Sequence, residues 1–254
     1  MNYFFGLKSA VFTSEIQIPT FQNRGLKFKN ISLYKALAEN SKWTIKKLER
    51  NRFNDDFFIV SGEEITNKDI YFIAYEKDLK NFDYKKLLNF NNYTDTAPSF
   101  RSNLKICLKN GGFSSYQSEY PYSMIVKKGT ILSPINSLAN KNAERNFIFI
   151  RNIYEEPFYE KFEAYLVNIK NRKIEETIEL TTNTSISFEL KKSLINPHIF
   201  LVTKDYLGIP LYVSTNQGHI SFEHTHPPHE YILSNNKYKK VSEIKNEINE
   251  IINQ

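Results

Sequence analysis

The chain has 254 residues, of which 41% are hydrophobic and 24% charged, and this balance is ordinary for a folded globular protein. No apolar run reaches the roughly 18 residues of a membrane-spanning helix, and eight glycines and nine prolines are too few for a collagen-like or low-complexity chain. The net charge is +6, but only seven of the 34 basic residues are arginines, the side chain best suited to bind phosphates and guanines. We therefore expect neither a nucleic acid nor a membrane as partner.

The single cysteine and the first residues bear on the cellular compartment. Cys107 is alone, so no disulfide can form within the chain. Residues 1–8 lack both the basic start and the sustained apolar stretch of a secretory signal. We expect a cytoplasmic protein.

The first hundred residues are predicted to mix helices and strands. The sequence favours short helices over 33–39, 44–49 and 83–90, with apolar residues at helical spacing. Aromatic and β-branched residues favour strands over 57–60 and 69–75.

The best candidate for a linker is the polar segment 91–99, which contains Pro98. We place a domain boundary there. The expected organisation is a mixed α+β region over 1–97, an antiparallel β-sandwich domain over 98–240 and a C-terminal helix over 241–254.

Strand patterns dominate from residue 100 onwards. They recur about every ten residues, with turn signals between them and without the long helices that a parallel sheet needs. The predicted strands are 104–108, 146–153, 162–169, 173–180, 185–190, 198–203, 210–214 and 219–224. The predicted fold class is mainly β: an antiparallel β-sandwich or barrel-like sheet with a mixed α/β N-terminal region and a C-terminal amphipathic helix. Arg151, inside an apolar strand, must find a partner or line a pocket.

The last residues of the chain are amphipathic at helical spacing. Their apolar positions are Val241, Ile244, Ile248, Ile251 and Ile252. We expect this helix to pack back on the sheet, and a contact for oligomerisation is the second interpretation.

All five histidines fall between residues 198 and 229. In a strand, His224 and His226 share a face with Phe222, so both imidazoles point to the apolar side of the sheet. An unpaired buried polar group costs about 1–3 kcal/mol, and one metal ion would satisfy two imidazoles at once. Two histidines and a carboxylate are the set that holds zinc or non-haem iron, and Glu230 is the nearby acid. We therefore expect a divalent metal, zinc or iron, at His224, His226 and Glu230.

The order of these residues resembles a known motif. Gly218, five residues, His224-Thr225-His226, three residues and then Glu230 are similar to the first metal-binding motif of the cupin family. The resemblance implies that the two histidines and the glutamate are three of four metal ligands. Lys237 stands where the family has a glycine, and no histidine follows His229 to supply the second motif of the family.

Two other interpretations of the histidines stay open. They can hydrogen-bond to the backbone or to tyrosines without any ion, or they can form a metal-free binding or acid–base site. His219 would lie on the opposite face from His224 and is the least favoured ligand. His198 begins another strand.

A second unusual stretch is residues 111–122, which carries Tyr116, Tyr120 and Tyr122 among hydroxyl and amide side chains. Rigid aromatic rings beside such groups suit sugar faces and polar peptides. The alternative is a hairpin or loop whose tyrosines only cover the edge of the core.

These segments lead to two hypotheses on function. In the first, a metal ion at the histidines activates water or binds a small polar or sugar-like substrate, with Glu230, Tyr116 and Tyr120 as candidate catalytic residues. The second is a non-catalytic binding module that recognises a glycan or a protein partner through the tyrosine-rich loop. Whether the protein is an enzyme stays open.

Overall fold

The computed structural model describes residues 2–21, 29–49, 52–53, 56–89, 102–125, 129–224 and 232–254. The chain divides into two compact units. The N-terminal unit comprises Met1–Lys127 together with two segments from later in the chain, Ile153–Glu160 and Thr182–Ser185. The C-terminal unit comprises Lys128–Asn152, Lys161–Thr181 and Ile186–Gln254.

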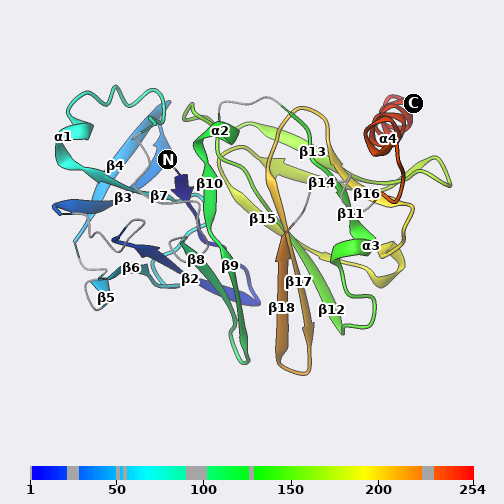
Figure 1. Ribbon diagram of the computed structural model, residues 1–254, viewed down its shortest axis with the longest axis horizontal. Coiled ribbons are helices and arrows are strands. Elements are labelled where there is room, and N and C mark those ends of the chain that lie inside the picture. The colour runs from blue at the N-terminus through cyan, green and yellow to red at the C-terminus, as the bar shows by residue number, and fades with distance from the viewer. Residues whose placement is uncertain are drawn as a thin grey trace. The chain divides into compact units, whose positions relative to one another are not determined.

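The described strands of the N-terminal unit form two antiparallel sheets (Figure 1). The first has the order β10-β1-β7-β3-β4, with strands Glu119–Pro121 (β10), Asn2–Phe4 (β1), Ile70–Tyr75 (β7), Ile31–Glu39 (β3) and Lys42–Leu48 (β4). The second has the order β5-β6-β2-β8-β9, with strands Arg52–Phe53 (β5), Phe57–Val60 (β6), Phe12–Pro19 (β2), Asn103–Leu108 (β8) and Phe113–Gln117 (β9).

The described strands of the C-terminal unit also form two antiparallel sheets. One has the order β11-β16-β13-β14, with strands Leu132–Pro134 (β11), Ile199–Thr203 (β16), Lys161–Asn168 (β13) and Lys173–Thr181 (β14). The other has the order β15-β12-β17-β18, with strands Ser185–Leu190 (β15), Arg145–Arg151 (β12), Ile209–Asn216 (β17) and His219–His224 (β18). Ile148 and Tyr212 of the second sheet share a buried core with Leu166 and Leu201 of the first, so the two sheets pack face to face.

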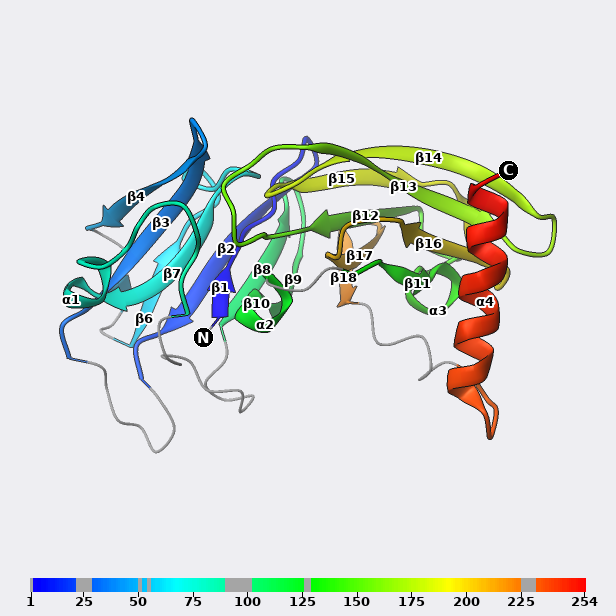
Figure 2. The ribbon, with the colours of Figure 1, turned by 90° about the horizontal axis from the view of Figure 1, so that it is seen from above.

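The C-terminal helix α4 (Lys237–Ile252) covers the other face of the β11-β16-β13-β14 sheet (Figure 2). Its Ile248 and Ile251 are buried against Val167, Phe200 and Val202. The predicted amphipathic helix and its packing on the sheet are thus confirmed, although the helix begins at Lys237 rather than at residue 241.

The remaining helices are short: α1 (Glu76–Leu79), α2 (Tyr122–Ile125), α3 (Ile135–Leu138) and the 3₁₀ turn η3 (Lys192–Leu194). Of the helices that the structure describes, none is long and apolar enough to span a membrane.

The mainly β, antiparallel class predicted from the sequence is confirmed. The turn between β17 and β18 lies at the expected place, since Asn216 pairs with His219 across Gln217 and Gly218. Both turn residues have positive φ, 47° and 80°, the backbone geometry for which glycine is suited.

The helices predicted over 33–39 and 44–49 are wrong, because these segments are the strands β3 and β4. Asn40 and Ser41 have φ values of 50° and 59°, which makes them the two-residue turn of a hairpin in which Glu39 pairs with Lys42. Tertiary pairing therefore overrides the helix preference of the Leu, Ala, Lys and Glu residues in this region. The segment 83–89 is not helical either.

The boundary expected near residue 97 falls outside the described residues. β8 pairs with β2 from Phe12↔Leu108 to Gln17↔Asn103, and β10 pairs with β1. The predicted strand 104–108, which we placed in the second domain, is β8 and belongs to the N-terminal unit.

Candidate functional site

The histidine segment is described as far as His224. Along β18, Ile220 and His224 are half-buried and Phe222 is buried, whereas His219 is exposed. The predicted alternation is confirmed: His224 lies on the apolar face and His219 on the other. His226, His229 and Glu230 lie outside the described residues, so the metal site stays a prediction.

Other described residues offer no alternative metal centre. No group of three or more His, Cys, Asp or Glu side chains within the described ranges is placed to hold a metal ion. His198 is exposed at the start of β16. Arg151 is completely buried at the end of β12 in the C-terminal unit.

The tyrosine segment forms strands rather than a loop: β9 is the second strand of a hairpin with β8, in agreement with the second interpretation, and β10 follows it. Tyr116 lies in β9 opposite Leu104, whereas Tyr120 lies in β10 opposite Tyr3, so the two belong to different sheets. Tyr120 is completely buried, and its ring meets that of Phe5 edge to face with centroids 6.4 Å apart. A fully buried ring cannot stack on a ligand at the surface, so Tyr120 is a core residue rather than a catalytic or stacking group.

Tyr122 takes part in a polar cluster around Glu155. Its hydroxyl donates to Glu155 Oε1 at 3.2 Å, and Lys86 Nζ lies 3.0 Å from Glu155 Oε2. Burial raises the pKa of Tyr122, and the negative charge of Glu155 raises it further. The cluster connects α2 and residue 86 to the Ile153–Glu160 segment within the N-terminal unit. Tyr122 therefore has a structural role.

A cleft of about 530 Å³ in the N-terminal unit is a stronger candidate site. We call it the lysine cleft, after three of its lining residues. It is lined by Lys35, Lys46, Lys47, Leu48, Glu49, Val60, Glu64 and Tyr71. Its volume lies within the range of about 300–1,000 Å³ that is usual for small-molecule sites.

The strand register explains why charged groups gather on this wall. Lys35 on β3 is directly opposite Lys46 on β4 and, on its other side, opposite Tyr71 on β7. Residues directly opposite each other in a ladder share a face of the sheet. Three neighbouring strands therefore place two ammonium groups and an aromatic ring on the same face.

A buried carboxylate, that of Asp69, contacts two of these side chains. Asp69 is 1% exposed, and its Oδ1 lies 3.6 Å from Lys35 Nζ. Its Oδ2 accepts hydrogen bonds from the Tyr71 hydroxyl at 3.1 Å and from the backbone N–H of Thr66 at 3.0 Å. Asp69 thus holds Lys35 and Tyr71 in place, as a charge in a buried site requires.

Lys46 has no such partner. Among the described residues, no carboxylate lies within ion-pair distance of its ammonium group, whereas Lys35 has Asp69. The wall of the cleft therefore carries an unneutralised positive charge next to a neutralised one, which is an arrangement suited to an anion.

Sequence reasoning missed this site because its residues come from separate segments of the chain, and the two segments that carry its lysines were predicted to be helical. The available signal was the Asn40-Ser41 turn, which would have paired Lys35 with Lys46.

In comparisons with known proteins, no protein-family model, no curated protein and no solved structure matches the chain.

Proposed function

We propose that the N-terminal unit is a binding module for a small polar anion of sugar size, such as a sugar phosphate or a sugar acid, and that the lysine cleft is its site. The observation that carries the proposal is the position of Lys35 directly opposite Lys46 on neighbouring strands. Asp69 supplies a counter-charge to Lys35 only, and a bound anion supplies one to Lys46 beside it.

The other lining residues suit the hydroxylated body of such a ligand. Glu49 and Glu64 supply carboxylate oxygens that accept hydrogen bonds from hydroxyl groups. The half-buried Leu48 adds apolar surface. The combination of cations, hydrogen-bond acceptors and apolar surface suits the recognition of a charged sugar.

Asp69 has a positioning role in this proposal. By holding the ammonium group of Lys35 at 3.6 Å, it fixes one of the two cations before the ligand arrives. A preorganised cation loses less side-chain entropy on binding than a free one, which favours affinity. The proposal requires no covalent step and no metal ion.

The test is a titration of the whole protein with glucose 6-phosphate and glucuronate, followed by amide chemical shifts and calorimetry. Neutral glucose is the matched control ligand. We expect both anions to shift the amides of residues 35, 46 and 71, and glucose to bind at least about tenfold more weakly, because a lost charge-assisted hydrogen bond costs about 1.5–3 kcal/mol.

The variant Lys46→Gln should weaken both anions about tenfold or more by the same energy. Lys42→Gln is the matched control, because Lys42 lies on the same strand but pairs with Glu39 and does not line the cleft. Equal binding of glucose and its phosphate, or an unchanged affinity in Lys46→Gln, would overturn the proposal, as would the absence of binding at millimolar ligand.

A further inference from the structure

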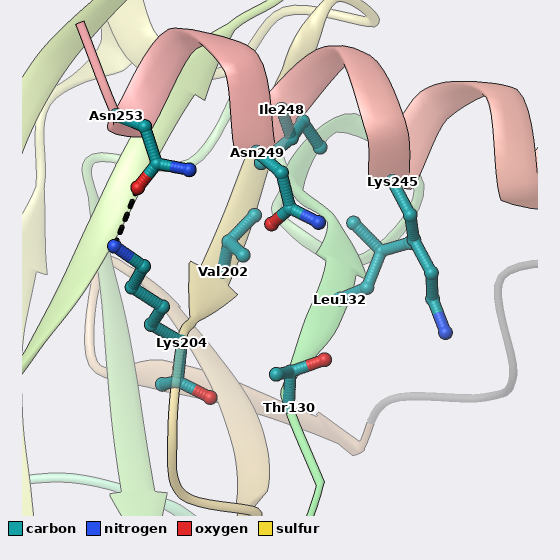
Figure 3. Close-up of a pocket in the computed structure, with 9 residues that line it drawn as sticks. Thr130, Leu132, Val202, Lys204, Lys245, Ile248, Asn249 and Asn253 are labelled. Carbon is teal, nitrogen blue, oxygen red and sulfur yellow. Dashed lines mark hydrogen bonds between the residues drawn. The ribbon is translucent and has the colours of Figure 1, made fainter.

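A second cavity, of about 350 Å³, lies in the C-terminal unit between helix α4 and the strands β11 and β16. We call it the helix pocket. Its lining residues are Thr130, Leu132, Val202, Thr203, Lys204, Lys245, Ile248, Asn249 and Asn253. Figure 3 shows Lys245, Asn249 and Asn253 along the helix, above Leu132 and Val202 of the sheet.

An apolar row and a polar row of residues on helix α4 explain why the pocket is apolar on one side and polar on the other. The apolar residues of α4 pack on the sheet through Ile248 and Ile251. Lys245, Asn249 and Asn253 follow each other at intervals of four residues, which places them in one polar row beside the apolar stripe. The pocket therefore has a polar rim and a narrow apolar floor, formed by the parts of Leu132 and Val202 that stay accessible at 9% and 6%, whereas Ile248 is only 1% exposed.

The charged residues of the rim that the structure describes are Lys204 and Lys245. Lys204 Nζ donates to Asn253 Oδ1 at 2.6 Å, and within the described part of the chain neither Lys204 nor Lys245 forms an ion pair. The acids of the helix are engaged elsewhere: Glu247 and Glu250 pair with Arg172 at 3.5 Å and 3.1 Å. None of the described residues that line the pocket is acidic.

We propose that the helix pocket binds a small amphipathic carboxylate, a monocarboxylic acid with a medium-length apolar chain. The chain lies against the accessible parts of Leu132 and Val202, and the carboxylate meets Lys204 or Lys245 and the side-chain amide of Asn249. The two charges and the apolar floor together favour an amphipathic carboxylate. A purely polar anion would leave the floor exposed to water, and a neutral apolar molecule would leave the ammonium groups without a counter-charge. The site is independent of the lysine cleft, which belongs to the other unit.

Octanoate is the probe for this proposal, with acetate as the anion without a chain and octanol as the chain without a charge. Calorimetry and amide chemical shifts on the whole protein measure the binding. We expect octanoate to bind at least tenfold more tightly than either control, with shifts at residues 202, 248 and 249.

The variant Lys204→Gln/Lys245→Gln should weaken octanoate at least tenfold and leave octanol unchanged. Lys239→Gln is the matched control, because Lys239 is on the same helix but points to Glu243, at 4.0 Å, and does not line the pocket. The proposal is overturned if acetate or octanol binds as tightly as octanoate, if the double variant binds octanoate normally, or if the shifts lie outside the pocket. None of these outcomes affects the lysine cleft, whose ligands and variants are different.

Discussion

The indole N–H of Trp43 donates a hydrogen bond to the backbone carbonyl of Glu155 at 2.9 Å, although the two residues are 112 positions apart. The same carbonyl accepts the backbone N–H of Leu87 at 2.8 Å. The Glu155 side chain also bonds to Tyr122 and Lys86, so a single residue from the later part of the chain joins three earlier segments. This contact fixes the Ile153–Glu160 segment in the N-terminal unit.

Replacing Trp43 by Phe should destabilise the N-terminal unit. Trp43 is 1% exposed, and the change removes both a buried hydrogen bond and part of a large buried ring. We expect a loss of about 2 kcal/mol in the free energy of unfolding. Urea denaturation followed by circular dichroism measures it. The control Phe113→Leu changes an aromatic residue that is 61% exposed and should lose less than about 1 kcal/mol. Equal losses in both variants would contradict the prediction.

Asn183 should be among the most sensitive polar positions. Its amide donates to the carbonyls of Glu156 and Phe158, both at 2.9 Å, and its Oδ1 accepts from the N–H of Tyr154 at 2.8 Å. It is completely buried, and its φ is 58°. We expect Asn183→Ala to cost about 3–4 kcal/mol, because three buried partners lose their bonds and alanine is strained in this backbone region.

Asn183→Gly separates these two causes. Glycine loses the same hydrogen bonds but adopts the positive φ without strain, so it should be about 1 kcal/mol more stable than the alanine variant. Denaturation midpoints of the two variants and the original protein give the comparison. Alanine at least as stable as glycine would show that backbone strain is not part of the cost.

Tyr165 should titrate at unusually high pH. Its hydroxyl donates to Glu163 Oε2 at 2.6 Å, and this bond, together with burial, raises the pKa of Tyr165 to about 12. The protonated hydroxyl is favoured in the folded state, so the stabilisation is complete below the ordinary tyrosine pKa of about 10 and is lost as the pH rises through the folded value. Glu163→Gln should lower this pKa toward 10, as measured by nuclear magnetic resonance of labelled tyrosine rings.

Glu179→Gln is the control for this titration, because Glu179 lies directly opposite Glu163 on β14 but bonds to Lys161. If both substitutions lower the pKa of Tyr165 equally, general negative charge rather than the hydrogen bond is the cause.

The predicted metal site is open to a direct measurement. Elemental analysis of protein purified without a histidine tag should find zinc or iron at one ion per chain, and the His224→Ala/His226→Ala double variant should lose it. His219→Ala is the control, because His219 is exposed on the opposite face of β18. Protein that is free of metal, with a stability unchanged by the double substitution, would end the metal hypothesis.

Several features of the fold were predictable from the sequence alone. The strand pattern after residue 100, the turn at Gln217 and Gly218 and the apolar stripe of α4 were predictable, because each depends on neighbours within a few positions. The face of His224 was also predictable, since alternation along one strand fixes it.

The partners of each strand were decided only by tertiary structure. Three features depend on which strands lie side by side: the Lys35–Lys46 pair, the salt bridge to Asp69 and the burial of Tyr120. The hydrophobic periodicity of a single segment does not tell which strand will be its neighbour. The sequence by itself determined the class of fold and the inward face of its local elements. Long-range strand pairing placed Lys35 and Lys46 in one cleft, although their segments have a preference for helix. The free energy gained by burying one face of a sheet exceeds the small differences between helix and strand propensities.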